Sequence, residues 1–250
     1  MSGPALSRDN AFLAYERYDR DRSVIELWVA DIRRGVTERL AAAGPAMDVS
    51  WSPDGTQLAY SATVGATVTA TRISVAQAGP PVSVLAGRRA IGWSADGTLI
   101  MLMNGTGVPA VGGPEIPVAT GAAVPRPSPD MRWVAYSAFG SATSEVYVQP
   151  FGGGRAIRVS TSGGADPQWR GDGRELFFRA PGGAMMVVAV APGPAFSAGR
   201  PDVLFRTPVD FASAGSSSYA VTQDGSRFLI ALPTGESTPL TAKYNWWLTP

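Results

Sequence analysis

Histidine and cysteine are both absent from the 250 residues. Their absence excludes Ser-His-Asp and Cys-His catalytic groups, thiol nucleophiles and disulfides. It also removes the ligands that zinc sites normally use. The nucleophile elbow G-x-S-x-G does not occur either. We therefore expect a protein that is not an enzyme and that has no metal and no cofactor.

Long apolar runs and an excess of charge are also absent. The longest apolar run, Ala184–Ala191, is far shorter than the roughly 20 residues of a transmembrane helix. Residues 1–4 show no basic region that leads into an apolar core, so no signal peptide is expected. The formal net charge is +1, without the clustered basic surface that nucleic acids require. We expect neither membrane insertion nor a nucleic-acid partner.

The residues that are abundant indicate many short strands. Hydrophobic residues make up 45% of the chain and charged residues 16%, which is ample material for a core. The 29 glycines and 21 prolines are spread along the chain between short apolar runs. This spacing favours an all-β fold, because turn residues at regular intervals separate strands.

A ten-residue repeat organises the chain. Its clearest copy is Trp51–Tyr60 (WSPDGTQLAY), and an aspartate at the fourth position is the only residue shared by all copies. Successive copies start 45, 42, 34, 42 and 52 residues apart. The six copies are Leu6–Tyr15, Trp51–Tyr60, Trp93–Leu102, Pro127–Tyr136, Trp169–Phe178 and Val221–Ile230.

Each repeat predicts a turn between two strands. The aspartate, followed by glycine in four copies, suits a tight connection between antiparallel strands. The eighth to tenth positions are apolar in every copy, which is typical of a strand buried on both faces. The aspartates could instead form an acidic ring, and Trp51, Trp93 and Trp169 could stack on a ligand. We favour turn and packing roles, because these residues recur at fixed repeat positions.

The repeat period predicts a six-bladed β-propeller of four-stranded antiparallel blades, because four strands in 40–45 residues is the propeller period. Residues 1–250 would form one domain. The third blade is expected to be short, and the last lacks a clear fourth strand, so its outer edge is expected to be incomplete. The N-terminus could lend a strand to close the ring, or the edge could stay open. The expected blades span residues 1–45, 46–87, 88–121, 122–163, 164–212 and 213–250.

The repeat W-S-P-D-G-x-x-L-A-Y, with a following strand such as Glu145–Gln149, resembles the TolB-type, WD40-like propeller repeat. Parts of the second half resemble the C-terminal sensor propeller of bacterial Ser/Thr protein kinases. These parts are Val146–Phe151, Arg158–Thr161, Gly163–Trp169, Asp172–Phe178, Tyr219–Ile230 and Tyr244–Trp246. The resemblance implies a bacterial sensor domain, extracytoplasmic (periplasmic) if it belongs to a membrane-anchored kinase and cytoplasmic otherwise.

Blade topology predicts where a ligand would bind. With the first strand innermost, the Asp-Gly turns lie on one face, and the longer, more variable loops lie on the other face, where binding loops tend to sit. Two such loops, Glu16–Arg22 and Arg206–Ser218, stand out, although both could simply be solvated. Gly152–Gly154 is interpreted as a turn, because it lacks the lysine of a phosphate-binding loop. Candidate ligand-binding residues at the channel mouth, expected just before the innermost strands, are Asp48, Arg88, Arg89, Arg126, Asp166 and Tyr219.

The sequence predicts a non-catalytic binding propeller that takes a protein, a peptide or a small polar ligand. The alternative is a hydrolase or lyase that uses facing carboxylates in the channel, such as Asp48 and Asp166, at a separation of roughly 5–10 Å. A third possibility is a purely structural part of a longer chain.

Overall fold

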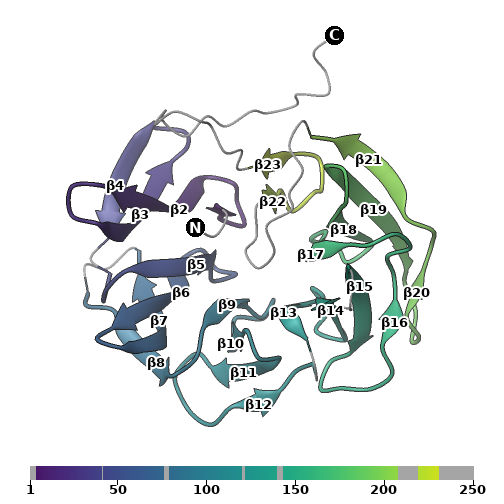
Figure 1. Ribbon diagram of the computed structural model, residues 1–250, viewed down its shortest axis with the longest axis horizontal. Helices are drawn as coiled ribbons and strands as arrows, with labels where there is room; N and C mark the ends of the chain where they lie inside the picture. Colours follow the sequence, from purple (N-terminus) through teal and green to yellow (C-terminus); the bar gives the residue numbers. More distant parts are fainter. Residues whose placement is uncertain are drawn as a thin grey trace.

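The computed structural model describes residues 4–40, 42–75, 79–119, 122–139, 143–207 and 219–230. These residues form 23 strands in six antiparallel sheets, which follow one another around a central axis (Figure 1). We number the sheets 1 to 6 in chain order. The architecture is an all-β propeller, as the sequence predicted. Within the described ranges, no helix is long and apolar enough to cross a bilayer.

The repeat begins at the end of the innermost strand of every sheet and connects it to the second strand. The innermost strands are β1 (Ala5–Leu6), β5 (Ala46–Trp51), β9 (Ala90–Trp93), β13 (Ala123–Pro127), β17 (Ala165–Trp169) and β22 (Tyr219–Val221). The second strands are β2 (Phe12–Asp19), β6 (Gln57–Val64), β10 (Leu99–Leu102), β14 (Trp133–Phe139), β18 (Glu175–Ala180) and β23 (Phe228–Ile230).

The third and outer strands complete sheets 1 to 5. The third strands are β3 (Val24–Asp31), β7 (Thr67–Ser74), β11 (Thr106–Pro109), β15 (Ser144–Pro150) and β19 (Ala184–Ala191). The outer strands are β4 (Val36–Leu40), β8 (Val82–Ala86), β12 (Ile116–Pro117), β16 (Ile157–Arg158), and the pair β20 (Ser197–Ala198) and β21 (Asp202–Arg206). Both β20 and β21 pair with β19, so they form one interrupted outer strand.

Two departures from a regular ring were anticipated. Sheet 3 is short, with four-residue strands β9, β10 and β11. Sheet 6 has two described strands, and its predicted third strand, Leu240–Leu248, lies outside the described residues. The structure therefore contains six sheets, while a complete sixth blade remains a prediction. Strand β1 pairs with β2, so this part of the N-terminal segment belongs to sheet 1.

The aspartate turn works as the sequence predicted. The residue after each aspartate has a left-handed backbone, a conformation that glycine adopts without steric cost. Asn10 and Met131 replace glycine there, with φ of 57° and 59°. Aspartate Oδ1 accepts the backbone N–H two residues later, for example Thr56 N at 3.0 Å.

A hydroxyl at the second repeat position completes this turn, a role that the sequence interpretation missed. The Ser52 hydroxyl donates to Asp54 Oδ1 (2.5 Å) and accepts Gln57 N–H (2.9 Å). The same pair of bonds occurs at Ser7, Ser94, Ser128 and Thr222. The recurring Ser or Thr two residues before the aspartate was the available signal.

These turns predict a loss of stability in acid. Hydrogen bonds from the hydroxyl lower the pKa of the turn aspartate from 3.8 in Asp9, Asp54 and Asp224, to about 2 in Asp224. A carboxyl group whose pKa is lower in the folded state stabilises the fold at pH values above its unfolded-state pKa. This stabilisation disappears as the pH falls through the folded-state pKa. The stabilising contribution of Asp224 should therefore be lost as the pH falls from 3.8 to about 2.

Urea unfolding between about pH 5 and about pH 2 measures this effect. Asp224→Asn should flatten the pH dependence in that window. Asp21→Asn is the control, because the Asp21 side chain is exposed and distant from any such turn. Identical slopes for Asp224→Asn and the wild type would contradict the assignment.

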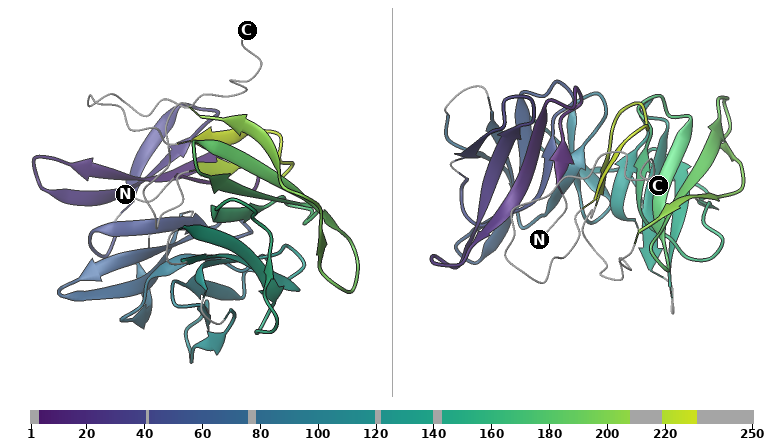
Figure 2. Two further views of the ribbon diagram at one scale, coloured as in Figure 1. Left: turned by 45° about the vertical axis from the view of Figure 1, so that its right-hand side comes forward. Right: turned by 90° about the horizontal axis from the view of Figure 1, so that it is seen from above.

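The turns of neighbouring sheets lie side by side on one face of the disc, which is seen edge-on in the right-hand view of Figure 2. A Cβ at Gly97 would contact Pro53 at 3.5 Å, and one at Gly173 would contact Pro129 at 3.6 Å.

The second strands are buried between neighbouring sheets, with Leu58, Ala59 and Tyr60 completely inaccessible.

Sheet 6 joins the ring through apolar packing on both sides. Phe228 packs in a cluster with Phe177 and Met185 of sheet 5. On the other side, Ala220 and Leu229 form a cluster with Leu13 of sheet 1. The described ring thus closes by side-chain packing between sheets 6 and 1.

Candidate functional site

A central channel with a cavity volume of about 330 Å³ lies between the innermost strands. All six sheets line it, and each contributes the residue immediately before its decapeptide: Ala5, Ser50, Gly92, Arg126, Gln168 and Ala220. The third repeat position of every sheet also lines it: Arg8, Pro53, Ala95, Pro129, Gly171 and Gln223. The channel therefore reaches the face of the Asp-Gly turns, whereas the sequence directed attention to the opposite face.

Side chains from neighbouring sheets bond the carbonyl groups of the innermost strands. The indole N–H of Trp51 donates to Ala5 O (2.9 Å), and that of Trp169 donates to Arg126 O (2.8 Å). The free edge of an innermost strand carries unpaired backbone groups, so these bonds satisfy the edge and join sheets. They confirm a packing role for Trp51 and Trp169.

Trp93 occupies the same repeat position but behaves differently. Its indole nitrogen is buried and has no hydrogen-bond partner in the structure. All three tryptophans line the channel wall. The indole N–H in sheet 3 therefore differs from the other two, although all three occupy the same position in the repeat.

Asp48 and Arg89, two of the predicted site residues, form an ion pair between sheets 2 and 3. Arg89 Nη2 and Nε lie 2.6 and 3.0 Å from Asp48 Oδ2. Glu16, which is buried, accepts the Asp48 backbone N–H at 2.6 Å. Asp48 lines the channel, and its charge is balanced by Arg89.

Arg88 points to a different partner and does not line the channel. Its Nε donates to Glu115 Oε1 at 2.8 Å, and its side chain is 44% exposed. Glu115 also accepts bonds from Thr106 and Asn104, which lowers its pKa. This ion pair lies within sheet 3, so adjacency in sequence does not place Arg88 and Arg89 in one site.

Asp166 and Tyr219 come together between sheets 5 and 6. Asp166 Oδ2 lies 3.6 Å from Arg179 Nε, and both side chains are 5% exposed. The Tyr219 hydroxyl donates to Asp166 O at 2.9 Å. Burial, and then the Asp166 carboxylate, raise the pKa of Tyr219 well above its ordinary value, so the hydroxyl stays protonated as a donor. Tyr219 lines the channel, whereas Asp166 is not among the lining residues.

Arg126 is the predicted residue that lies in the channel wall with its charge unbalanced. Its Nη1 donates to the Ile91 carbonyl of sheet 3. It takes part in none of the ion pairs that the described residues form. Gly92 leaves room for the guanidinium, because a Cβ there would lie 2.9 Å from Arg126 Nη1.

The predicted position of the site residues needs one correction. Asp48, Arg126, Asp166 and Tyr219 lie within the innermost strands rather than just before them. For Asp48, Arg126 and Asp166, the reason is a bulge in β5, β13 and β17, where register shifts occur. Asp48, Val124 and Asp166 have φ of 60°, 54° and 56° at these bulges.

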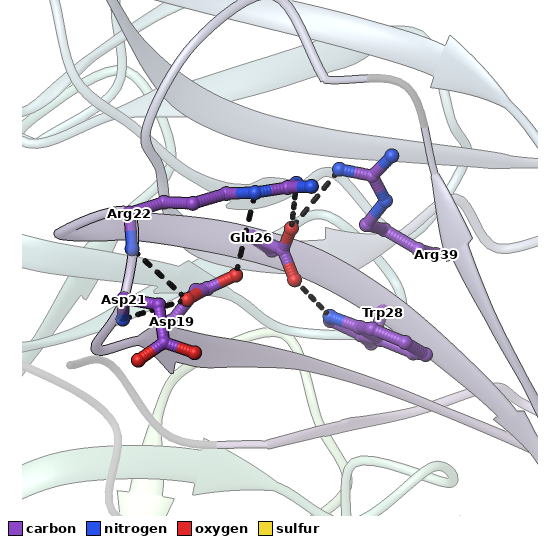
Figure 3. A network of polar contacts seen from close by, with 6 residues as sticks. All are labelled: Asp19, Asp21, Arg22, Glu26, Trp28 and Arg39. Carbon is purple, nitrogen blue, oxygen red and sulfur yellow. Dashed lines mark hydrogen bonds and ion pairs between the residues drawn. The ribbon is translucent and has the colours of Figure 1, made fainter.

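The segment Glu16–Arg22, expected as a loop, is mostly strand, because β2 continues to Asp19 and pairs with β3 throughout. Figure 3 shows the polar network at its end. Glu26 accepts Trp28 Nε1 (3.0 Å) and Arg39 Nη1 (2.9 Å) and lies 3.7 Å from Arg22 Nη1. The hairpin is therefore held by contacts within sheet 1.

Two further segments were singled out from the sequence, the glycine turn and the loop Arg206–Ser218. Gly152–Gly154 lies between β15 and β16 with positive φ at each glycine, so it is a turn, as predicted. Most of the second expected loop, residues 208–218, lies outside the described residues.

Comparison with solved structures shows the propeller fold. A TolB protein from Agrobacterium tumefaciens is 18% identical, with 82% of this chain and 80% of that chain covered and a TM-score of 0.65. The Myceliophthora thermophila Cps50 (Swd1) propeller is 11% identical, with 92% and 79% covered and a TM-score of 0.60. An oligogalacturonate lyase in complex with manganese is 15% identical, with 95% and 72% covered and a TM-score of 0.62. No family model and no curated protein matches the chain.

Proposed function

We propose that this propeller is a non-catalytic binding module that takes a peptide, a segment of a protein or a small polar ligand in its central channel. The observation that carries the proposal is the channel itself, a cavity of about 330 Å³ to which all six sheets contribute. Its volume falls at the lower end of ligand pockets. Its lining combines three indoles with Ser50, Gln168 and two arginines, and polar groups that converge on a cavity can orient a bound ligand.

The carboxylate chemistry of the alternative function finds little support in this geometry. Asp48 is bonded to Arg89, and Asp166 is paired with Arg179. A general acid–base pair needs carboxylates that can reach a substrate, and these two are buried and engaged. Among the residues with described structure, no group of three or more acidic side chains could hold a metal.

A channel-blocking variant tests the binding proposal. Ala95, at the rim, is replaced by tryptophan to narrow the mouth, and Val203→Trp on the outer strand β21 is the control. Purified protein is screened by thermal shift against short peptides, sugars and small acids. We expect ligands that stabilise the wild type and the control but not Ala95→Trp. Ligands that stabilise all three proteins equally, or no ligand in a broad screen, would contradict channel binding.

We further propose that the module acts as the sensor part of a bacterial Ser/Thr kinase or regulator. The proposal rests on the resemblance of Val146–Phe151, Gly163–Trp169 and Asp172–Phe178 to kinase-linked propellers. A reading frame that encodes a kinase segment and a transmembrane segment ahead of this chain would support it. An isolated reading frame without either segment would count against it.

A further inference from the structure

Three hydrogen-bond donors in neighbouring sheets are buried in the channel wall without partners. They are Ser50 Oγ in sheet 2, Trp93 Nε1 in sheet 3 and Arg126 Nε in sheet 4. All three residues line the channel. We call this group the donor sector. An unsatisfied buried donor costs free energy, so the three together indicate a group that accepts hydrogen bonds when the channel is occupied.

Among the described residues that line the channel, the buried side-chain atoms without a hydrogen-bond partner all belong to the donor sector. Trp51 and Trp169, at the same repeat position, each donate to the innermost strand of the preceding sheet. On the opposite side of the channel, the Gln168 amide donates to Tyr219 O at 2.7 Å. The repeat therefore can satisfy its inner donors, and Ser50, Trp93 and Arg126 depart from it.

The charge of the donor sector is positive. Three charged side chains line the channel, namely Arg8, Asp48 and Arg126. Asp48 is balanced by Arg89 at 2.6 Å, whereas Arg8 and Arg126 enter none of the ion pairs formed by the described residues. Both arginines are thus left to attract an anion.

The backbone around Arg126 supports a specific role for this side chain. Val124, two residues earlier, has φ of 54°, which is unfavourable for a β-branched residue. Such strain persists where the surrounding structure imposes it, often at binding sites. In sheet 3, a Cβ at Gly92 would collide with the guanidinium.

Resting on the proposed channel binding, we propose that the donor sector binds a carboxylate group of the ligand. Arginine and indole nitrogens only donate, so their complement is a group with several acceptors and negative charge. A carboxylate can accept two bonds from one guanidinium, and Arg126 is the one arginine within the donor sector, so a single negative charge matches it. The carboxylate can belong to a peptide C-terminus or to a small organic acid.

The test uses four probes: glutarate, trialanine with a free C-terminus, trialanine amide and inorganic phosphate. Calorimetric titration of the full chain should show binding of glutarate or trialanine, and weaker binding of the amide. Preference for trialanine would assign a peptide C-terminus, and preference for glutarate a small acid. Arg126→Gln should weaken binding of the better carboxylate at least about tenfold, because it removes a charged hydrogen-bond donor. Arg158→Gln, an exposed arginine outside the channel, is the matched control.

Trp93→Phe provides a second variant that does not depend on the stability of Arg126→Gln. Because the Trp93 N–H has no hydrogen bond to lose, Trp93→Phe should lower the unfolding temperature less than Trp51→Phe does, while it weakens carboxylate binding several-fold. Trp51→Phe should lower the unfolding temperature, because it removes the bond to Ala5 O.

The outcomes separate this inference from the channel proposal. If Arg126→Gln and Trp93→Phe both leave carboxylate binding unchanged, the donor sector does not bind the carboxylate. Tighter binding of inorganic phosphate than of either carboxylate would also overturn the inference. A neutral ligand that Ala95→Trp excludes but Arg126→Gln still binds would also overturn it, while the channel proposal would stand. Equal binding of trialanine and its amide, without binding of glutarate, would exclude recognition of the carboxylate.

Discussion

Replacement of Asp166 by alanine should lower the free energy of unfolding by about 3–5 kcal/mol, because it removes the carboxylate that pairs with the buried Arg179 guanidinium. The two side chains are each 5% exposed and lie 3.6 Å apart. Chemical denaturation measures the effect. Arg158→Ala is the control, since the exposed pair of Arg158 with Glu145, 4.0 Å apart, should contribute no more than about 1 kcal/mol.

A double variant separates the buried charge from the lost contacts. Asp166→Asn combined with Arg179→Met removes both charges and should be more stable than Asp166→Asn alone. A cost below about 1 kcal/mol for Asp166→Ala would show that the pair is solvated in solution. A loss of ligand binding in Asp166→Ala would therefore follow from destabilisation of the fold and not from the loss of a contact with the ligand. Arg126 is therefore the better residue with which to test the channel.

Replacement of Phe228 by alanine should cost about 3–5 kcal/mol and loosen sheet 6 selectively. Phe228 is 3% exposed, and its ring centroid lies 5.1 Å from that of Phe177 and 5.2 Å from that of Phe205, both edge-on. It is thus the main apolar contact between sheets 5 and 6. Its removal creates a cavity where sheet 6 joins the ring.

Denaturation and amide hydrogen exchange together measure this effect. Exchange should accelerate in β22 and β23 more than in β6, because the lost contacts hold sheet 6 to its neighbour. Phe196→Ala is the control, because the Phe196 ring is only partly buried against Trp133. A cost as small as that of the control, or uniform acceleration of exchange, would contradict a special role for Phe228.

The sequence by itself determined the repeating unit. The aspartate turn and the apolar second strand were predicted in every copy, and the short third sheet was predicted as well. These features depend on contacts between residues within ten positions, such as Asp54 with Thr56, so each repeat carries its own information. Even the missed role of Ser52 was visible in the sequence as a recurring hydroxyl.

Only the tertiary structure decided what each inner-strand side chain does. Asp48 and Arg89 are 41 positions apart, and Tyr219 reaches Asp166 across 53 positions. Trp51 and Trp93 are equivalent in the repeat, yet one donates to a carbonyl and the other has no partner. The physical reason is that turns are set by local backbone geometry, which a periodic sequence repeats. Contacts across the channel depend instead on the register and bulges of neighbouring sheets, which no single repeat encodes.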